Sequence, residues 1–149
     1  MSSARPTLVG IHHLKLPVSN LAVSLRWWEA AFGARRQEHL DHVSPEGTCF
    51  GHILSVPGLE APLELVLDAG HAARRPAFDP VALAVETRDD LVSWAAWFDA
   101  VGLANSGLRR GLGGWLVMVR DPDETPVRLH SRETRDWDAA NADFGSPWL

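Results

Sequence analysis

Two residues able to move protons or bind a metal lie at opposite ends of the first half of the chain, His13 near its start and Glu64 near its end. Imidazole exchanges protons near neutral pH, and a carboxylate serves as a base or as a metal ligand. Apolar residues alternate with His13 and Lys15 from residue 11 to 18, which predicts a strand with these two side chains on one face. We expect the apolar face to meet a helix and the polar face to meet a cavity.

The second half of the chain repeats this pattern with different chemistry. The stretch IHHLKLPV resembles FDPVALAV, and PLELVLDAG resembles the end of DPDETPVRLH. An offset of 67 residues aligns the first strands and places His13 opposite Pro80, and an offset of 64 aligns the last strands and places Glu64 opposite Arg128. Proline has no side-chain donor, and guanidinium is a permanent cation with no lone pair for a metal.

The elements that would position these residues follow from spacing and turn chemistry. Strands are predicted over residues 11–18, 35–42, 48–56, 62–68, 80–86, 115–120 and 126–130. A helix follows the first of these strands, with Ser19 or Asn20 as its N-cap, and another follows the fifth, with Thr87 or Asp89 as its N-cap. The Gly-rich stretch GLANSGLRRGLGG is predicted to be a loop or a weak edge strand, and the arginine pair within it would suit a lid over a cavity.

These elements form two tandem units in one domain of α+β class. We assign a β-α-β-β-β module to residues 8–70, a polar linker to 71–77, a second module to 78–131, and a tail to 132–149. The tail is polar apart from three aromatic residues, and it could wrap the body of the protein or a partner subunit.

Composition excludes several function classes. The net charge is −5 and the basic residues are scattered, so we expect no nucleic-acid binding. No apolar run is long enough to span a membrane, and the first residues lack the apolar stretch of a signal peptide, so we expect a cytoplasmic protein with no membrane partner. The single cysteine, Cys49, excludes an intrachain disulfide and a zinc site built from thiolates, and we interpret it as a small hydrophobe in a strand.

The chain resembles the vicinal oxygen chelate superfamily, which includes glyoxalase I, bleomycin and fosfomycin resistance proteins and extradiol dioxygenases. The resemblance covers residues 8–131 through IHHLKLPVSNLAVSLRWWEAAFGA, PLELVLDAG, FDPVALAVETRDDL and VRDPDETPVRLH, in this order. It implies paired βαβββ modules that form a curled mixed sheet around a central cavity, and it implies a homodimer.

The resemblance also implies that a divalent metal would be held at four positions, namely His13, Glu64, Pro80 and Arg128. Only the first two can bind an ion, whereas a catalytic site normally needs three protein ligands. We therefore expect no metal and no other cofactor, with a divalent metal as the alternative. In its place we expect Arg128 to form an ion pair with Glu64.

The site predicted from these residues binds a small acidic or carbonyl-bearing molecule. His13 and Glu64 are the candidate catalytic residues, and the candidate substrate-binding residues are Lys15, Arg128, His130 and Trp115. Strand alternation leaves two alternatives open: His12 could face inward in place of His13, or other histidines on or near strands could rebuild a metal site. Those histidines are His39, His42, His52 and His130.

Three functions are consistent with this site. The first is a metal-independent isomerase or lyase that works by proton transfer and by polarising an oxygen. The second is a protein that binds an antibiotic or another small molecule without altering it. The third is a metal-dependent lyase, epimerase or dioxygenase. The sequence does not decide between an enzyme and a binding protein.

Overall fold

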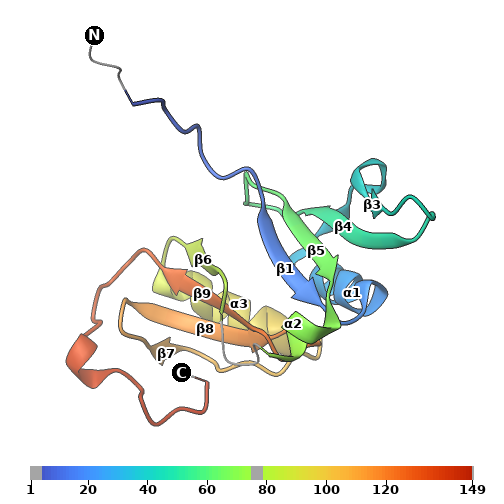
Figure 1. Cartoon of the computed structure of the whole chain (residues 1–149). Coiled ribbons are helices and arrows are strands. Elements are labelled where there is room, and N and C mark those ends of the chain that lie inside the picture. The colour runs from blue at the N-terminus through green and yellow to red at the C-terminus, as the bar shows by residue number, and fades with distance from the viewer. Residues whose placement is uncertain (1–4, 75–78, 149) are drawn as a thin grey trace.

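The computed structural model describes residues 5–74 and 79–148, which form an α+β fold with two sheets (Figure 1). This confirms the predicted fold class. The elements are β1 (Leu14–Val18), α1 (Leu21–Phe32), β2 (Arg35–Arg36), η1 (Glu38–Leu40), β3 (His42–Val43), β4 (Cys49–Ser55), β5 (Leu63–Leu67), α2 (Ala69–Ala73), β6 (Ala82–Val85), α3 (Arg88–Ala100), β7 (Arg109–Arg110), β8 (Trp115–Arg120), β9 (Pro126–Ser131) and η2 (Ala139–Asn141).

Each half of the chain builds its own sheet. The first sheet has the order β1-β5-β4-β2, with β3 also paired to β4, and the second has the order β6-β9-β8-β7. The first strand of each half lies parallel to the last, with Lys15 opposite Glu64 in one sheet and Ala82 opposite Arg128 in the other. Offsets of 67 and 64 residues relate these two pairs, so the two sheets repeat one register.

The two long helices begin and end as their capping residues predict. The Asn20 side chain accepts a hydrogen bond from the Val23 amide at the start of α1, and Gly33 ends this helix in the left-handed conformation with φ 66°. At α3 the Thr87 hydroxyl and the Asp90 carboxylate form a capping box. The helices therefore start and stop at positions encoded locally.

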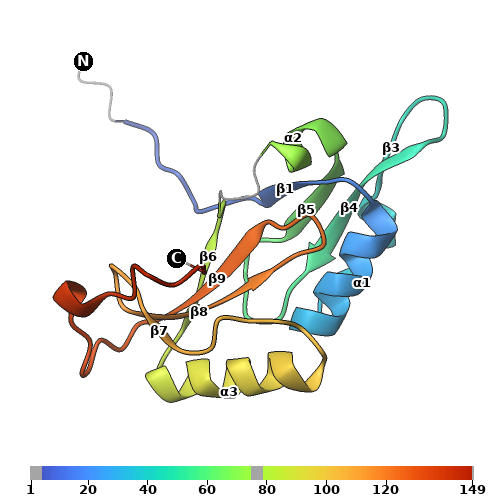
Figure 2. The same ribbon diagram turned by 90° about the horizontal axis from the view of Figure 1, so that it is seen from below.

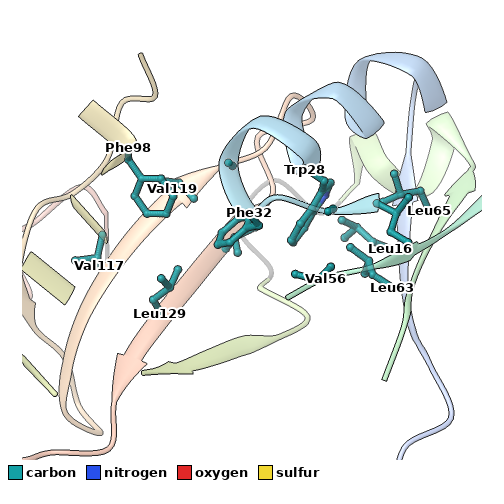
Figure 3. Packing of buried hydrophobic residues seen from close by; sticks show 14 of the residues in the cluster. Leu16, Trp28, Phe32, Val56, Leu63, Leu65, Phe98, Val117, Val119 and Leu129 are labelled. Atoms are coloured by element: carbon teal, nitrogen blue, oxygen red, sulfur yellow. The ribbon is translucent and has the colours of Figure 1, made fainter. Parts of the chain in front are cut away.

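The core lies where each helix packs on its own sheet and where the two halves meet. Trp28 of α1 points toward the first sheet, whereas Phe32 of α1 packs on Phe98 of α3 between the two halves (Figure 3). Figure 2 shows α3 lying along one face of β8 and β9. Since the helices cover one face of each sheet, the opposite face of the first sheet is left for polar side chains.

Several segments differ from the predicted elements. The strand predicted over 35–42 is interrupted by η1, because its hydrogen bonds to β4 stop after Gln37 and the pairing resumes at His42. Residues 69–73 span the end of the predicted first module and the start of the predicted linker, and they form a short helix capped by Asp68. Residues 75–78, which include the rest of the linker beyond residue 74, lie outside the described residues.

The tail packs on the second half of its own chain. The indole N–H of Trp137 donates to the carbonyl of Gly111, and the Arg120 guanidinium lies 4.5 Å from the ring centre of Trp148. Of the two alternatives predicted for the tail, the structure shows the one in which it wraps its own body.

Within residues 5–74 and 79–148, no helix is both long enough and apolar enough to cross a bilayer.

Candidate functional site

Glu64 is a buried carboxylate surrounded by three basic side chains. It lies on β5 with 3% of its surface exposed. Its Oε2 is 3.2 Å from His13 Nε2 and 3.7 Å from Lys15 Nζ, and its Oε1 is 3.0 Å from His42 Nδ1. A buried carboxylate is costly unless it is paired, and these contacts supply the pairing. The predicted group of His13, Lys15 and Glu64 is thus brought together, with His42 as an added member.

His42 reaches Glu64 from β3 by crossing β4. Its partner in the strand register is Gly51, which is also opposite Val66 of β5. A Cβ atom at Gly51 would lie 3.2 Å from both Cβ and Nδ1 of His42. The absence of a side chain at Gly51 therefore gives the imidazole its path across the sheet.

The two imidazoles leave one ring nitrogen each for other partners. With an ionised Glu64, each contacting ring nitrogen carries a proton and donates to the carboxylate, which fixes the tautomer in the manner of an Asp–His pair. The free nitrogen of His42 is then Nε2, on a side chain 41% exposed. The free nitrogen of His13 is Nδ1, which lies 2.9 Å from Nδ1 of His12. His42 thus offers an unprotonated Nε2 to solvent, while the buried carboxylate of Glu64 holds its ring in place.

Arg128 does not contact Glu64, so the predicted ion pair between them is wrong. Nε of Arg128 instead lies 2.7 Å from Oδ2 of Asp79, just before β6. Strand β9 places Arg128 in the second sheet, whereas Glu64 belongs to the first. The nearer carboxylate of Asp79 neutralises the guanidinium, and Glu64 is neutralised by residues of its own sheet.

The other predicted site residues lie in the second half of the chain. His130 is partly buried on β9, and burial, with the nearby Arg128 charge, holds its pKa below the usual range. Trp115 is 4% exposed, and its indole N–H donates to the carbonyl of Arg135. Trp115 is therefore packed in the core, and its contact with a substrate stays a prediction.

A second polar cluster lies between β4 and the segment before β3. Nδ1 of His52 is 3.1 Å from Oδ1 of Asp41 and 3.7 Å from Sγ of Cys49. These are one carboxylate, one imidazole and one thiol, with ligand atoms close enough together to hold a metal ion. The Arg36 guanidinium donates to Asp41 and holds the pKa of that carboxyl below its usual range. Sequence reasoning named His52 among the histidines that could rebuild a metal site, but it did not place Asp41 and Cys49 with it, because that depends on the register between β3 and β4.

One cavity of the described residues lies away from Glu64. It has a volume of about 620 Å³ and lies where the end of α1 meets α3 and the end of β6. Its walls include Phe32, Trp94 and Trp97, with Glu86, Asp90 and Ser93 as polar groups. A smaller cavity of about 50 Å³ lies between the two halves and is lined in part by Lys15 and Pro80.

A comparison with known protein families identifies the family of the chain. The sequence profile of the Glyoxalase/Bleomycin resistance protein/Dioxygenase superfamily matches residues 10–129. The chain belongs to this superfamily. The family resemblance predicted from the sequence is therefore confirmed. Comparison with curated proteins found no match.

Solved structures of this superfamily share the fold. A glyoxylase/bleomycin resistance protein/dioxygenase domain from Frankia sp. EAN1pec is 25% identical, with a TM-score of 0.62 over 84% of this chain and 98% of that one. The antibiotic binding protein TnmS3 from Streptomyces sp. CB03234 is 17% identical, with a TM-score of 0.68 over 87% of this chain and 100% of that one. The fosfomycin resistance protein FosX from Listeria monocytogenes is 14% identical, with a TM-score of 0.64 over 85% of this chain and 96% of that one.

Proposed function

We propose that the protein binds a small acidic or carbonyl-bearing molecule on the open face of the first sheet and acts on it by proton transfer without a divalent metal. The observation that carries this proposal is Glu64, buried and in contact with two partly exposed imidazoles. A substrate oxygen would be held by Lys15, whose side chain is 59% exposed. His42 or His13 would take the proton, and Glu64 would stabilise the resulting imidazolium.

Arg128 and His130 lie on β9 of the second sheet, and the proposed proton transfer at Glu64 gives them no direct role. Arg128 has the register position that Glu64 has in the first sheet, and His130 has that of Val66. We propose that the protein forms a homodimer in which a polar sheet face of one copy is covered by the other copy. Light scattering after size exclusion would give twice the mass of 16.4 kDa, and a monomer at micromolar concentration would contradict the dimer.

Deuterium exchange tests the proton transfer. The protein, treated with a chelator and returned to D₂O buffer, is incubated with a panel of 2-oxo acids, 2-hydroxy acids and β-keto acids, and NMR follows loss of the C–H signal beside the carbonyl. We expect exchange of at least one compound by wild type and none by Glu64→Gln. Saturable binding without exchange of any bound compound would remove the catalytic role.

Binding of an unaltered ligand is a second candidate function, favoured by the cavity between α1 and α3. Its volume is within the range of pockets for drug-sized molecules, and three of its nine lining residues are aromatic. Among similar folds, TnmS3 is described as an antibiotic binding protein. Equilibrium dialysis with a panel of apolar antibiotics tests this function. Weaker binding in Trp97→Ala but not in Val92→Ala, an exposed α3 variant, would support it, and absence of binding would remove it.

Metal-dependent catalysis is the third candidate, and His42 is the observation that favours it. His13, His42 and Glu64 supply two imidazoles and one carboxylate, which suit a catalytic first-row ion. An ion held there would polarise a substrate oxygen. A mutant of FosX from Listeria monocytogenes was crystallised in complex with Mn(II) and dihydroxypropylphosphonic acid. The Lys15 ammonium competes for the same carboxylate oxygen as His13, and we therefore prefer the metal-free mechanism.

Elemental analysis separates these two mechanisms. One equivalent of manganese, iron, nickel or zinc in wild type, lost in His42→Ala but retained in Cys49→Ser, would establish a metal at Glu64. Exchange activity that survives complete removal of metal would exclude a catalytic need for it.

A further inference from the structure

The cluster of Asp41, Cys49 and His52 has the geometry of a metal site separate from Glu64. All three ligand atoms lie within 4.8 Å of one another. Both Asp41 Oδ1 and Cys49 Sγ approach the same ring nitrogen of His52, Nδ1, at 3.1 and 3.7 Å. A catalytic relay would need the carboxylate and the thiol on different nitrogens of the ring, so this is not a Cys–His–Asp triad.

The distances match those between ligands of one tetrahedral ion. Zinc binds sulfur at about 2.3 Å and nitrogen or oxygen at about 2.0 Å, so tetrahedral angles separate sulfur from nitrogen by roughly 3.5 Å and nitrogen from oxygen by roughly 3.3 Å. The observed separations of 3.7 and 3.1 Å lie close to both values. The third pair, Cys49 and Asp41, has its ligand atoms within 4.8 Å of each other.

The chemistry of the three ligands selects the ion. A thiolate and an imidazole favour zinc over magnesium, calcium and manganese, which prefer oxygen. With the thiol ionised, one thiolate and one carboxylate balance the charge of a divalent cation. Arg36 donates to both carboxylate oxygens of Asp41, with its Nε 3.1 Å from the Oδ1 that also faces His52, and it would hold this carboxylate in place as an outer-shell partner.

We propose that Asp41, Cys49 and His52 bind one zinc ion, with water as the fourth ligand. The side chain of His52 is only 8% exposed and that of Asp41 12%, so the ion would be largely enclosed by protein. Asp41 precedes His42 in the chain, while Cys49 and His52 belong to β4. The ion would tie the start of β3 to β4 and so hold His42 in its position against Glu64. This proposal does not depend on catalysis at Glu64.

Cobalt titration tests the site, because Cys49 is the only cysteine of the chain. Cobalt(II) bound to a thiolate gives a charge-transfer band in the near ultraviolet, so this band reports on Cys49 alone. Chelator-treated, reduced protein is titrated with Co²⁺ and then with Zn²⁺. We expect the band to saturate at one equivalent and to be removed by one equivalent of zinc. Glu64→Gln should keep the band, which separates this site from the proposed active site.

Variants decide whether the three residues act together. Cys49→Ser, a nearly isosteric change, should lose the band, and His52→Ala should weaken cobalt binding at least about 10-fold. His39→Ala, an exposed histidine of η1, is the matched control and should bind as wild type does. Circular dichroism checks that each variant is folded. No thiolate band in reduced wild type, or a band of unchanged affinity in folded His52→Ala, would overturn the proposal.

Discussion

Gly51 lies opposite His42 in the β3–β4 register, and the imidazole of His42 crosses over it to reach Glu64. An added Cβ at Gly51 would be 3.2 Å from the Cβ of His42, which is tighter than ordinary van der Waals contact. Since that contact involves the base of the side chain and not its flexible end, β3 itself would have to move. The contact between His42 and Glu64 thus depends on a residue that takes no part in it.

Gly51→Ala should therefore reduce function without unfolding the protein. Displacement of a proton-transferring group by a fraction of an ångström to one ångström can lower a rate by about 10²-fold. We expect a loss approaching this size in the deuterium-exchange rate, together with a changed chemical shift of the His42 ring. Gly113→Ala is the control, because a Cβ there meets no atom within 4 Å. Equal rates in the two variants would show that His42 does not take part.

Glu64→Gln should abolish proton transfer while preserving the fold. The amide has the same shape but no charge, so it no longer stabilises a protonated imidazole at His42 or His13. General acid–base groups typically contribute about 10²- to 10⁴-fold to a rate, and we expect a loss in this range. Glu60→Gln, on the exposed segment before β5, is the control. If Glu64→Gln retains the wild-type exchange rate at an unchanged melting temperature, Glu64 has no catalytic role.

Asp121→Asn should change how stability depends on pH. Burial raises the pKa of Asp121 to about 6, and its Oδ2 has no hydrogen-bond partner among the described residues. Because the folded state holds this proton more tightly than the unfolded state, the stability from Asp121 is fully present below its unfolded pKa. It is lost as the pH rises through about 6.

The difference in unfolding free energy between Asp121→Asn and wild type isolates this effect from the other carboxyl groups. Asparagine keeps the Oδ1 acceptor for the amides of Asp123 and Thr125 and cannot ionise. A pKa change from 3.8 to about 6 corresponds to about 3 kcal/mol of unfolding free energy. The unfolding free energy of the variant should therefore rise by this amount relative to that of wild type as the pH increases from about 3 to about 8. Urea unfolding at several pH values measures the difference, and a constant difference would contradict the raised pKa.

Trp28 should be the most sensitive core position of the first half. It is 2% exposed between α1 and the first sheet, and it packs on Phe32 with ring centres 5.0 Å apart. Trp28→Ala should lower the unfolding free energy by about 3 to 5 kcal/mol. Trp28→Phe should cost less, because it keeps an aromatic ring and removes a buried indole N–H that has no partner among the described residues. Denaturant unfolding of both variants tests the order.

The sequence by itself determined the elements, the duplication and the family. Apolar alternation marked the first and last strands of each half, and caps such as Asn20 and Thr87 marked the helix starts, because these signals act within a few residues of the chain. Alternation also predicted one side for His13 and Lys15, and both contact Glu64, although β1 begins only at Leu14. The same local rules could not show that η1 interrupts the strand predicted over 35–42, since that depends on pairing with β4.

Only the tertiary structure decided which charged groups meet. Alternation shows which face of a strand a side chain takes, but not which neighbour from another strand or sheet lies across from it. His42 reaches Glu64 because Gly51 lies between them, and Arg128 pairs with Asp79 because both belong to the second half. Such contacts are set by register and packing between segments far apart in the chain, which a pattern along one strand does not contain.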